Sequence, residues 1–512
     1  MALAAGPALA LPSFDEVRAD FRSSETLVLS REGEVIQRLR TDATVRRGQW
    51  LGLADVSPAL QRALVLSEDR RFYEHSGVDW AAVSAAAWAN LWHERTRGAS
   101  TLTMQLAGLL DGDWRQGPGG RTVTQKMGQA VAAQLLERRW RKDQILEAYL
   151  NLVPFRGELV GIDALARTLF GKAAHGLDER ESAVAAALVR APNARPALVA
   201  RRACGVLRDM QQGQADCEAL DLFTTAALQR RAYDASAGIA PHFARQWLRG
   251  GHGAGQRSSL SAPLQRMAQQ TLQRHLRELA GRNVQDAALV VLDNASGEVL
   301  AWVGSSGPLS QAAEVDGVLA LRQPGSTLKP FLYAQAIAEK RLTAASLLHD
   351  SPAQIATAGG LYIPQNYDRQ FKGWVSVRQA LGSSLNVPAV RTLVMVSPDA
   401  FFAQLRRLGL ALRESGGYYG YSLALGSSEV RLLELANAYR ALANGGRVSP
   451  VAYAPGARAA FTQALDAGAA FIVGDILADA NARVPTFVSD SVLNTRFWTA
   501  VKTGTSKDMR DN

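Results

Sequence analysis

The sequence predicts a multidomain protein in which a mostly α-helical half is followed by an α+β half. Apolar residues recur at helical spacing from about Pro58 to Leu198. Two apolar runs flank an Asn-Ala-Ser-Gly turn within Ala287–Ser305, a pattern typical of paired strands, and helical patterns return from Pro330 onward. The chain has 512 residues, which is enough for about two to four domains with sizeable cores.

The composition is that of a globular protein with an excess of positive charge. Charged residues make up 20% and hydrophobic residues 47% of the chain, which excludes a largely disordered protein. With 57 Lys and Arg against 47 Asp and Glu, the formal net charge is +10. Such a charge favours an anionic partner, such as nucleic acid, a phospholipid surface or a pyrophosphate-bearing substrate. The basic residues are dispersed and no nucleic-acid motif occurs, so we expect no nucleic-acid partner; solvated surface charge is the plain alternative.

Residues 1–25 are interpreted as the remnant of a membrane anchor. The start, MALAAGPALALP, is apolar, but it is shorter than the roughly twenty residues of a spanning helix and lacks the basic region of a signal peptide. The upstream part of an anchor would then lie outside this chain; a frayed N-terminus is the alternative. Residues 26–44 are predicted to form a short β segment, because TLVLSREGEVIQRLR alternates like a hairpin around a Glu-Gly turn.

The helical half contains acidic and hydroxyl-rich stretches suited to catalysis and ligand binding. In LSEDRRFYEHSGVDW, Glu68, Phe72 and His75 recur at helical spacing, which predicts one shared helix face. The stretch GASTLTMQLA, residues 98–107, is rich in Ser and Thr and suits the binding of sugar or phosphate oxygens. The alternative for Glu68 and its neighbour Asp69 is a merely solvated helix edge.

Residues 201–282 are predicted to form a linker region of mixed helix and loop, clearest at the Gly-rich RGGHGAGQRSS. A second interruption, WRQGPGGR at 114–121, is interpreted as a loop within the helical half. Cys204 and Cys217 can close a short disulfide loop in an oxidising compartment, and two unpaired buried thiols are the alternative. Neither has Cys or His neighbours at metal-ligand spacing, so no metal site is expected.

The stretch Arg322–Pro330, RQPGSTLKP, predicts a nucleophilic serine. Pro324 and Gly325 break the chain just before Ser326, and the apolar FLYAQAIA predicts a helix directly afterwards. Ser326 is then expected in the first helical turn, with Lys329 three residues on and on the same face. A desolvated lysine has a lowered pKa, so its free amine can take the proton from the serine hydroxyl.

Two later stretches supply groups that such a serine needs. Ser384–Asn386 has the form SxN, in which the serine can relay a proton and the asparagine can hold a substrate amide. Lys502–Thr505, KTGT, is expected at the end of a strand within FWTAVKTG. It offers a cation for a terminal carboxylate and an open strand edge for an extended peptide. Taken singly, each stretch has a plain alternative as a helix start, a loop serine or a surface lysine.

From about Asp286 to its end, including QNYDRQFKGWVSVRQAL, the chain resembles the transpeptidase domain of penicillin-binding proteins, whose signature is these three motifs in this order. The resemblance is assigned to residues 283–512 and implies an α/β sandwich, here incomplete at its C-terminus. It implies Ser326 as the acylated nucleophile, Lys329 as its base and Ser384 as the proton relay. The residues implied in substrate binding are Asn386, Lys502, Thr503, Gly504 and Thr505.

Residues 45–200 resemble the peptidoglycan glycosyltransferase domain, which is lysozyme-like and uses lipid II, a lipid-linked disaccharide-pentapeptide. Four stretches in order carry the resemblance: LSEDRRFYEHSGVDW, GASTLTMQLA, KDQILEAYLN and GIDALARTLFGK. It implies Glu68 as the general base that deprotonates an acceptor sugar hydroxyl, with polyprenyl pyrophosphate as the leaving group. The residues implied in substrate binding are Asp69, Phe72, His75, Ser100, Thr101, Gln105, Lys126 and Gln129.

Three positions depart from the usual pattern of this family. Gln129 stands where most members have a second glutamate, Gly108 where a basic residue is usual, and Met104 where glutamine is common. Because glutamine cannot ionise, pyrophosphate departure would depend on Arg121, Lys126 or other nearby cations. In having Met104 and Gln129 at these positions, the chain resembles the 1C subgroup of the bifunctional class A penicillin-binding proteins. No cofactor is implied, and a divalent cation assisting pyrophosphate departure stays open.

The resemblance implies an enzyme of the periplasm, anchored in the bacterial inner membrane, that acts on lipid II and nascent peptidoglycan and takes β-lactams as covalent inhibitors. Two other functions stay open: a peptidoglycan hydrolase with a D,D-carboxypeptidase, and a β-lactam-binding scaffold with a weak or inactive glycosyltransferase half. The sequence ends at Asn512, before the strands that flank KTG in the family. We therefore expect this chain to be acylated poorly by a β-lactam, and a longer one to be labelled at Ser326.

Overall fold

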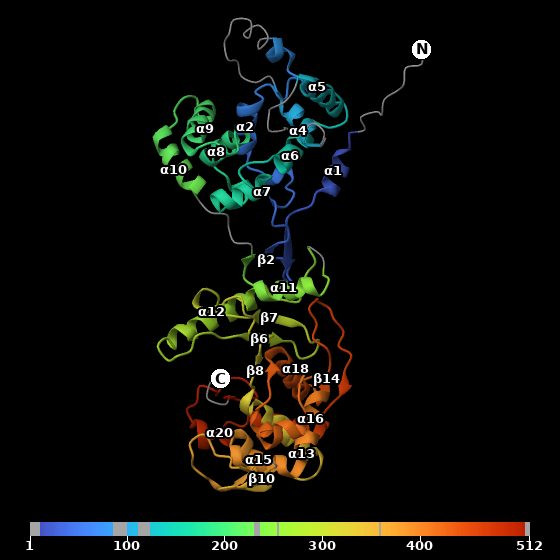
Figure 1. The fold of residues 1–512 in the computed structure, drawn as a ribbon, viewed down its shortest axis with the longest axis vertical. Helices are drawn as coiled ribbons and strands as arrows, with labels where there is room; N and C mark the ends of the chain where they lie inside the picture. Colours follow the sequence, from blue (N-terminus) through green and yellow to red (C-terminus); the bar gives the residue numbers. More distant parts are fainter. Residues whose placement is uncertain are drawn as a thin grey trace, which may run out of the picture. The chain divides into compact units, whose positions relative to one another are not determined.

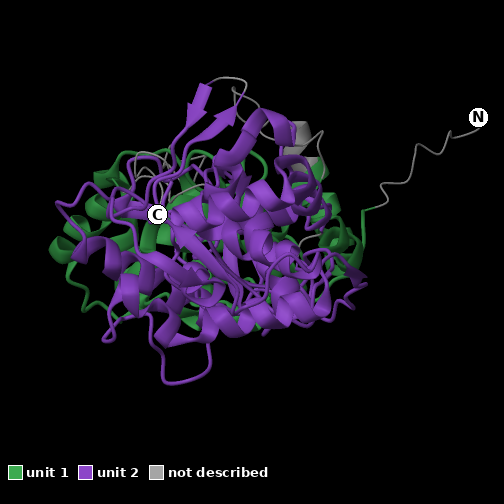
Figure 2. Ribbon diagram, turned by 90° about the horizontal axis from the view of Figure 1, so that it is seen from below, with its two compact units in different colours: residues 1–26, 38–237 green, residues 27–37, 238–512 purple. Residues whose placement is uncertain are grey.

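The computed structural model describes residues 11–84, 100–110, 123–229, 236–252, 255–357 and 360–506, without the side chains of 123–127. The chain divides into two compact units (Figure 2). Unit 1 comprises Met1–Thr26 and Arg38–Ala237, and unit 2 comprises Leu27–Gln37 and Gly238–Asn512. Each unit has its own buried hydrophobic core.

Unit 1 is mostly helical, as predicted. Helices α2, α8 and α9 pack against one another, α10 packs on α9, and α4 packs on α5 and α6 (Figure 1). The short strands β3 and β4 pair in parallel. The described helices are α1 (Phe14–Asp20), α2 (Pro58–Glu68), α4 (Leu102–Leu110), α5 (Val123–Glu137), α6 (Lys142–Leu152), α7 (Ile162–Leu165), α8 (Glu179–Arg190), α9 (Pro196–Met210) and α10 (Cys217–Gln229), and the strands are β3 (Arg46–Arg47) and β4 (Leu159–Val160).

The predicted hairpin forms, but it belongs to a larger sheet. Strands β1 (Glu25–Leu29), β2 (Val35–Arg40) and β5 (Ser236–Gly238) form a three-stranded sheet in the order β1-β2-β5. The tip of the hairpin is held within unit 2, where the Arg31 amide donates to the Leu260 carbonyl at 2.8 Å. The chain therefore passes between its two units within these strands. The sequence pattern showed the hairpin but not the distant third strand.

The described part of residues 1–25 is packed into unit 1, which differs from the expected anchor remnant. Leu11 and Phe14 are buried in the unit 1 core, and the Phe14 ring meets Trp140 edge to face at 5.4 Å. Ser13 caps α1 through a capping box with Glu16, and the rest of the helix is largely charged. Within the described ranges, no helix has the length and apolarity needed to cross a membrane. Residues 1–10 lie outside the description.

The expected linker at 201–282 is mostly helix divided between the two units. Helices α9 and α10 pack in unit 1, whereas α11 (Pro241–Arg249) and α12 (Ala262–Glu278) lie in unit 2. Both pairs of helices bury an apolar face. The short polar connections between the helices led to the prediction of a linker. Cys204 and Cys217 form a disulfide that joins α9 to the start of α10, with 5.3 Å between their Cα atoms. The predicted loop at 114–121 lies outside the described residues.

Unit 2 combines helices with small antiparallel sheets, which confirms the predicted α+β class. Strands β6 and β7 form the predicted hairpin, and α12 packs on β7 (Figure 1). The described strands are β6 (Leu289–Leu292), β7 (Val299–Val303), β8 (Leu321–Arg322), β9 (Leu347–Asp350), β10 (Ile355–Thr357), β11 (Gly360–Tyr362), β12 (Gly373–Ser376), β13 (Val430–Arg431), β14 (Arg447–Val448) and β15 (Thr462–Gln463). Beyond α11 and α12, its described helices are α13 (Lys329–Ala338), α14 (Val377–Gly382), α15 (Asn386–Val396), α16 (Pro398–Arg407), α17 (Gly416–Tyr419), α18 (Leu432–Ala443), α19 (Ala467–Ala478) and α20 (Ala480–Phe487).

Helix α13 is the centre of the unit 2 core. It packs against α14, α15, α16 and α19, and its residues Phe331, Leu332 and Tyr333 are fully buried. A helix that is apolar all round can only be stable when other elements cover every side. The first residue of α13, Lys329, is fully buried with them. The fold thus buries a lysine side chain next to an apolar core.

Candidate active sites

The turn that carries Ser326 lies directly before α13. Residues Gly325–Leu328 form one 3-10 turn, and Ser326 is half-buried within it. Gly325 has a φ of 55°, and a Cβ there would collide with the Thr505 backbone. From α18, the Tyr439 hydroxyl donates to the Thr327 carbonyl at 2.7 Å and fixes the other side of the turn. The Pro-Gly break predicted from the sequence therefore serves a close approach of two backbones.

Lys329 connects this turn to the SxN tripeptide. Its Nζ donates to the Ser384 carbonyl at 2.7 Å, the Leu385 carbonyl at 3.1 Å and Asn386 Oδ1 at 2.7 Å. Burial lowers the pKa of Lys329 well below its usual value, and the positive charge of Lys502 lowers it further. No hydrogen bond between Lys329 and Ser326 occurs among the described residues, and the three SxN acceptors surround the amine instead.

Lys502 completes the junction of the three motifs. Its Nζ donates to Ser384 Oγ at 2.8 Å and to the Thr503 carbonyl at 2.6 Å. Burial lowers the pKa of Lys502 to about 7. Ser384 has a φ of 58°, an uncommon conformation for a residue with a side chain, and lysines hold both its carbonyl and its hydroxyl. The structure thus brings together SxxK, SxN and KTG, which lie far apart in the sequence.

The KTGT segment packs against the serine turn as a loop. A Cβ at Gly504 would stand 2.7 Å from the Pro324 carbonyl oxygen, so glycine is needed there. Thr503 is half-buried and Thr505 is exposed. The predicted strand in FWTAVKTG is wrong for the described residues, since 497–506 contain no strand. The reason is that no described strand pairs with it; the Val501 amide donates to the Leu477 carbonyl of α19 instead.

In unit 1, Glu68 is the last residue of α2 and is half-buried. Its Oε1 accepts from the Ser67 hydroxyl at 3.0 Å, and its Oε2 accepts from Gln105 Nε2 at 3.2 Å. The Tyr149 hydroxyl of α6 donates to Gln105 Oε1 at 2.7 Å, which fixes the orientation of that amide. Three helices therefore position the Glu68 carboxylate, and both of its oxygens lie against neutral donors.

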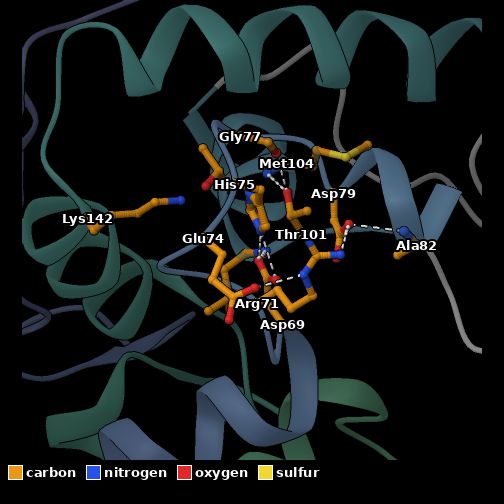
Figure 3. Close-up of polar contacts among 12 residues, drawn as sticks. Asp69, Arg71, Glu74, His75, Gly77, Asp79, Ala82, Thr101, Met104 and Lys142 are labelled. Carbon is orange, nitrogen blue, oxygen red and sulfur yellow. Dashed lines mark hydrogen bonds and ion pairs between the residues drawn. The ribbon is translucent and has the colours of Figure 1, made fainter.

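Glu68, Phe72 and His75 do not share a helix face, because α2 ends at Glu68. Residues 70–77 follow as turns, and a tertiary contact sets their course. His75 Nε2 lies 2.9 Å from Asp69 Oδ1 (Figure 3). The Leu102 amide at the start of α4 donates to Asp69 Oδ2 at 3.0 Å. Phe72 is fully buried. Asp69, Phe72 and His75 therefore shape the loop beside Glu68 through contacts with the protein itself.

In the hydroxyl-rich stretch, the Thr101 side chain likewise forms its hydrogen bonds within the protein. The buried Thr101 Oγ1 donates to the Gly77 carbonyl at 2.6 Å and accepts from the Met104 amide at 3.2 Å (Figure 3). This threonine caps α4 and ties it to the loop after α2. Ser100 Oγ is buried without a hydrogen-bond partner in the described part of the chain. Gln105 is the member of the stretch that reaches Glu68.

The positions that depart from the family pattern are buried. Gln129, Met104 and Gly108 are all inside unit 1. Lys126 lies on α5 with its side chain outside the description, and Arg121 is outside it altogether. Searched over the described residues, the chain has no cluster of three or more His, Cys, Asp or Glu that could hold a metal ion.

Sequence reasoning missed four residues that support the two sites. Tyr149 orients Gln105, Tyr439 holds the serine turn, and Asp350 with Asn366 lies behind the SxN asparagine. Tyr149 and Asn366 both stand in stretches already singled out, KDQILEAYLN and QNYD. Tyr149 is a polar group on a largely apolar helix, which is stable there only when it is paired; nothing in the polar stretch around Asn366 indicates that this side chain is buried.

Comparison with known proteins assigns a family to each half of the chain. The family model of the transglycosylases matches residues 32–211, and that of the penicillin-binding protein transpeptidase domain matches residues 287–509. The chain belongs to the penicillin-binding proteins that join these two domains. This confirms the family predicted from the motifs.

Among individual proteins, the chain is similar to penicillin-binding protein 1C of Escherichia coli, with 35% identity over 95% of this chain and 62% of that protein. It is 31% identical to penicillin-binding protein 1B of Vibrio cholerae, over 88% of this chain and 62% of the relative. The chain thus spans about three fifths of the length of these relatives. The crystal structure of penicillin-binding protein 1A from Haemophilus influenzae has the same fold, with a TM-score of 0.50, 18% identity, and coverage of 90% of this chain and 80% of that one.

Proposed function

We propose that this chain is a bifunctional peptidoglycan synthase of the 1C type. Unit 1 polymerises lipid II into glycan strands, and unit 2 cross-links stem peptides through an acyl-enzyme on Ser326 that β-lactams mimic. The observation that carries the proposal is the junction at Lys329, a buried amine bound to the SxN tripeptide whose serine is bound by Lys502. The proposed cellular location is the periplasmic face of the bacterial inner membrane, where lipid II and nascent peptidoglycan are the partners.

In the acylation step, neutral Lys329 takes the proton of the Ser326 hydroxyl as its oxygen attacks the carbonyl of the penultimate D-alanine. The peptide bond then breaks, and the terminal D-alanine leaves as an amine that receives a proton through Ser384. The lowered pKa of Lys329 supports this role, because an amine must be neutral to act as a base. A neutral amine donates only two hydrogens, so Lys329 has to give up one of its three SxN acceptors in this step. Its nitrogen can then accept the proton of Ser326.

In the second step, the amine of a neighbouring stem peptide attacks the acyl-enzyme, and Ser326 leaves with its proton restored. Asn386 would hold the peptide amide, and Lys502 with Thr503 and Thr505 would bind the terminal carboxylate of the donor. Gly504 supports this role, because its missing side chain lets the loop lie against the serine turn.

In glycosyl transfer, the Glu68 carboxylate takes the proton of the acceptor sugar hydroxyl, whose oxygen attacks the anomeric carbon of the growing chain. The bond to polyprenyl pyrophosphate breaks, and the pyrophosphate leaves. The support is that Glu68 is half-buried and positioned by Ser67 and Gln105. Lys126 is the proposed partner of the pyrophosphate; Gln129, also implied by the sequence, is fully buried and would have to be uncovered to contact it. A divalent cation is left open.

Exposure to a fluorescent penicillin should label the protein covalently at Ser326, at the low rate expected from the sequence, because KTGT lies in a loop with no described strand beside it. Attack by the serine opens the β-lactam ring and leaves an ester, so the peptide containing Ser326 should gain the mass of one β-lactam. Mass spectrometry of the digested protein checks this, with Ser326→Ala as the unlabelled control. Labelling of Ser326→Ala at the rate of the parent protein would show that another nucleophile reacts.

The pH dependence of acylation should follow the charge of Lys502. With its pKa lowered to about 7, this side chain is charged below that pH and neutral above it. Because a β-lactam carries a carboxylate, the second-order rate constant should fall as the pH rises through that value. Lys502→Arg keeps its charge, so its rate constant should stay level over the same range. An alkaline fall that persists in Lys502→Arg would belong to a different group.

A further inference from the structure

A buried carboxylate stands behind the SxN tripeptide. Asp350, the last residue of β9, is fully buried. Its two oxygens accept from Asn366 Nδ2 at 2.9 and 2.8 Å, and Oδ2 also accepts from the Lys372 amide at 2.8 Å. A buried charge is stable only when donors surround it, so these contacts fix the carboxylate in one orientation.

The carboxylate in turn fixes the amide of Asn366. Because Nδ2 faces Asp350 and the Gln370 carbonyl, Oδ1 must face the opposite way. There it accepts from the Asn386 amide at 2.9 Å and the Val387 amide at 3.3 Å, the first two backbone donors of α15. These amides have no partner within their helix, so Asn366 caps α15 from a distant segment.

The same segment also orients the side chain of Asn386. Its Nδ2 donates to the carbonyl of Gln365, the residue next to Asn366, at 2.8 Å. Its Oδ1 is therefore left to face Lys329 Nζ at 2.7 Å. If this amide turned over, two donors would face each other at that distance, which is unfavourable in a buried site.

We propose that Asp350 and Asn366 are positioning residues for transpeptidation, which hold Asn386 so that its carbonyl oxygen faces the amine of Lys329. This inference rests on the proposed acylation of Ser326. It adds a function for the QNYD stretch, whose asparagine connects a buried carboxylate to the motif that contacts the base. Neither residue touches the reacting atoms, so both act through Asn386.

The test compares acylation by a fluorescent penicillin across pH in four variants of the full chain. Asn366→Ala removes the link and should lower the second-order rate constant by about 10- to 100-fold, the effect of losing a set of buried hydrogen bonds. Asn366→Asp puts a second carboxylate against Asp350 and should lower it at least as much. The double variant Asp350→Asn with Asn366→Asp restores one amide and one carboxylate, and should recover to within about tenfold of the parent. Asp368→Asn is the matched control, an exposed carboxylate of the same segment paired with Lys372, and should keep the parent rate.

The pH profile separates positioning from loss of structure. Charged Lys329 is stabilised by Asn386 Oδ1 and opposed by the nearby charge of Lys502. Without Asn366 the backbone amides of Asn386 and Val387 lose their acceptor and the side chain of Asn386 is free to turn from Lys329. The acid limb of Asn366→Ala should then move to lower pH while melting shows a folded protein. A rate within twofold of the parent at every pH in Asn366→Ala would overturn the inference, as would a loss without a shifted limb and without recovery in the double variant. If the parent protein itself is not acylated at Ser326, the proposed function fails instead.

Discussion

Replacing Lys329 with methionine should lower the second-order rate constant for acylation of Ser326 by about 10²–10⁴-fold, the usual contribution of a positioned general base. The side chain is fully buried and its Nζ is the amine that joins the SxxK turn to SxN. Methionine fills a similar volume without supplying a base. The rate of ester formation, followed by mass spectrometry or by fluorescence of the labelled protein, measures the effect.

The loss of the amine also leaves the Ser384 and Leu385 carbonyls and Asn386 Oδ1 without their donor. Some of the effect could therefore come from the fold, so melting has to be measured alongside. Lys340→Met is the matched control, since Lys340 is exposed in the same unit just after α13, and it should acylate like the parent. A folded Lys329→Met protein that acylates at the parent rate would remove Lys329 from the mechanism.

The sequence identified the chemistry of unit 2 because the three motifs are short and local. A Pro-Gly break before an apolar run specifies a turn followed by a buried helix, so the positions of Ser326 and Lys329 could be predicted. The partners of Lys329 could not be predicted, because they come from the separate segment Ser384–Asn386. The loop conformation of KTGT could not be predicted either, because a segment becomes a strand only where another strand pairs with it.

Unit 1 shows where periodicity misleads. The pattern of Glu68, Phe72 and His75 continues the spacing of α2, but the helix ends because Asp69 pairs with His75 and with the Leu102 amide. Helix propensity is a weak preference, and buried hydrogen bonds to one side chain can outweigh it. Likewise, Thr101 looked like a ligand-binding hydroxyl, although its partners are the Gly77 carbonyl and its own helix.

Replacing Glu68 with glutamine should lower the rate of glycan polymerisation from lipid II by about 10²–10⁴-fold. Glutamine keeps an oxygen that can accept from Ser67 or Gln105 but cannot take a proton at neutral pH, so the geometry is nearly retained while the base is lost. Gel analysis of the polymer formed from labelled lipid II measures the yield. Labelling of Ser326 by penicillin should stay at the parent level, because that reaction does not use Glu68.

Glu74→Gln is the matched control, because it makes the same chemical change at an exposed carboxylate of the neighbouring turn, where Arg71 is its ion-pair partner. A surface pair of this kind contributes little, so polymer yield should be unchanged. If Glu68→Gln polymerises as well as the parent, another group is the base. Equal near-zero yields in the parent and in Glu68→Gln would instead favour a β-lactam-binding scaffold, in which Gln129 and Gly108 mark a glycosyltransferase half that has lost its activity.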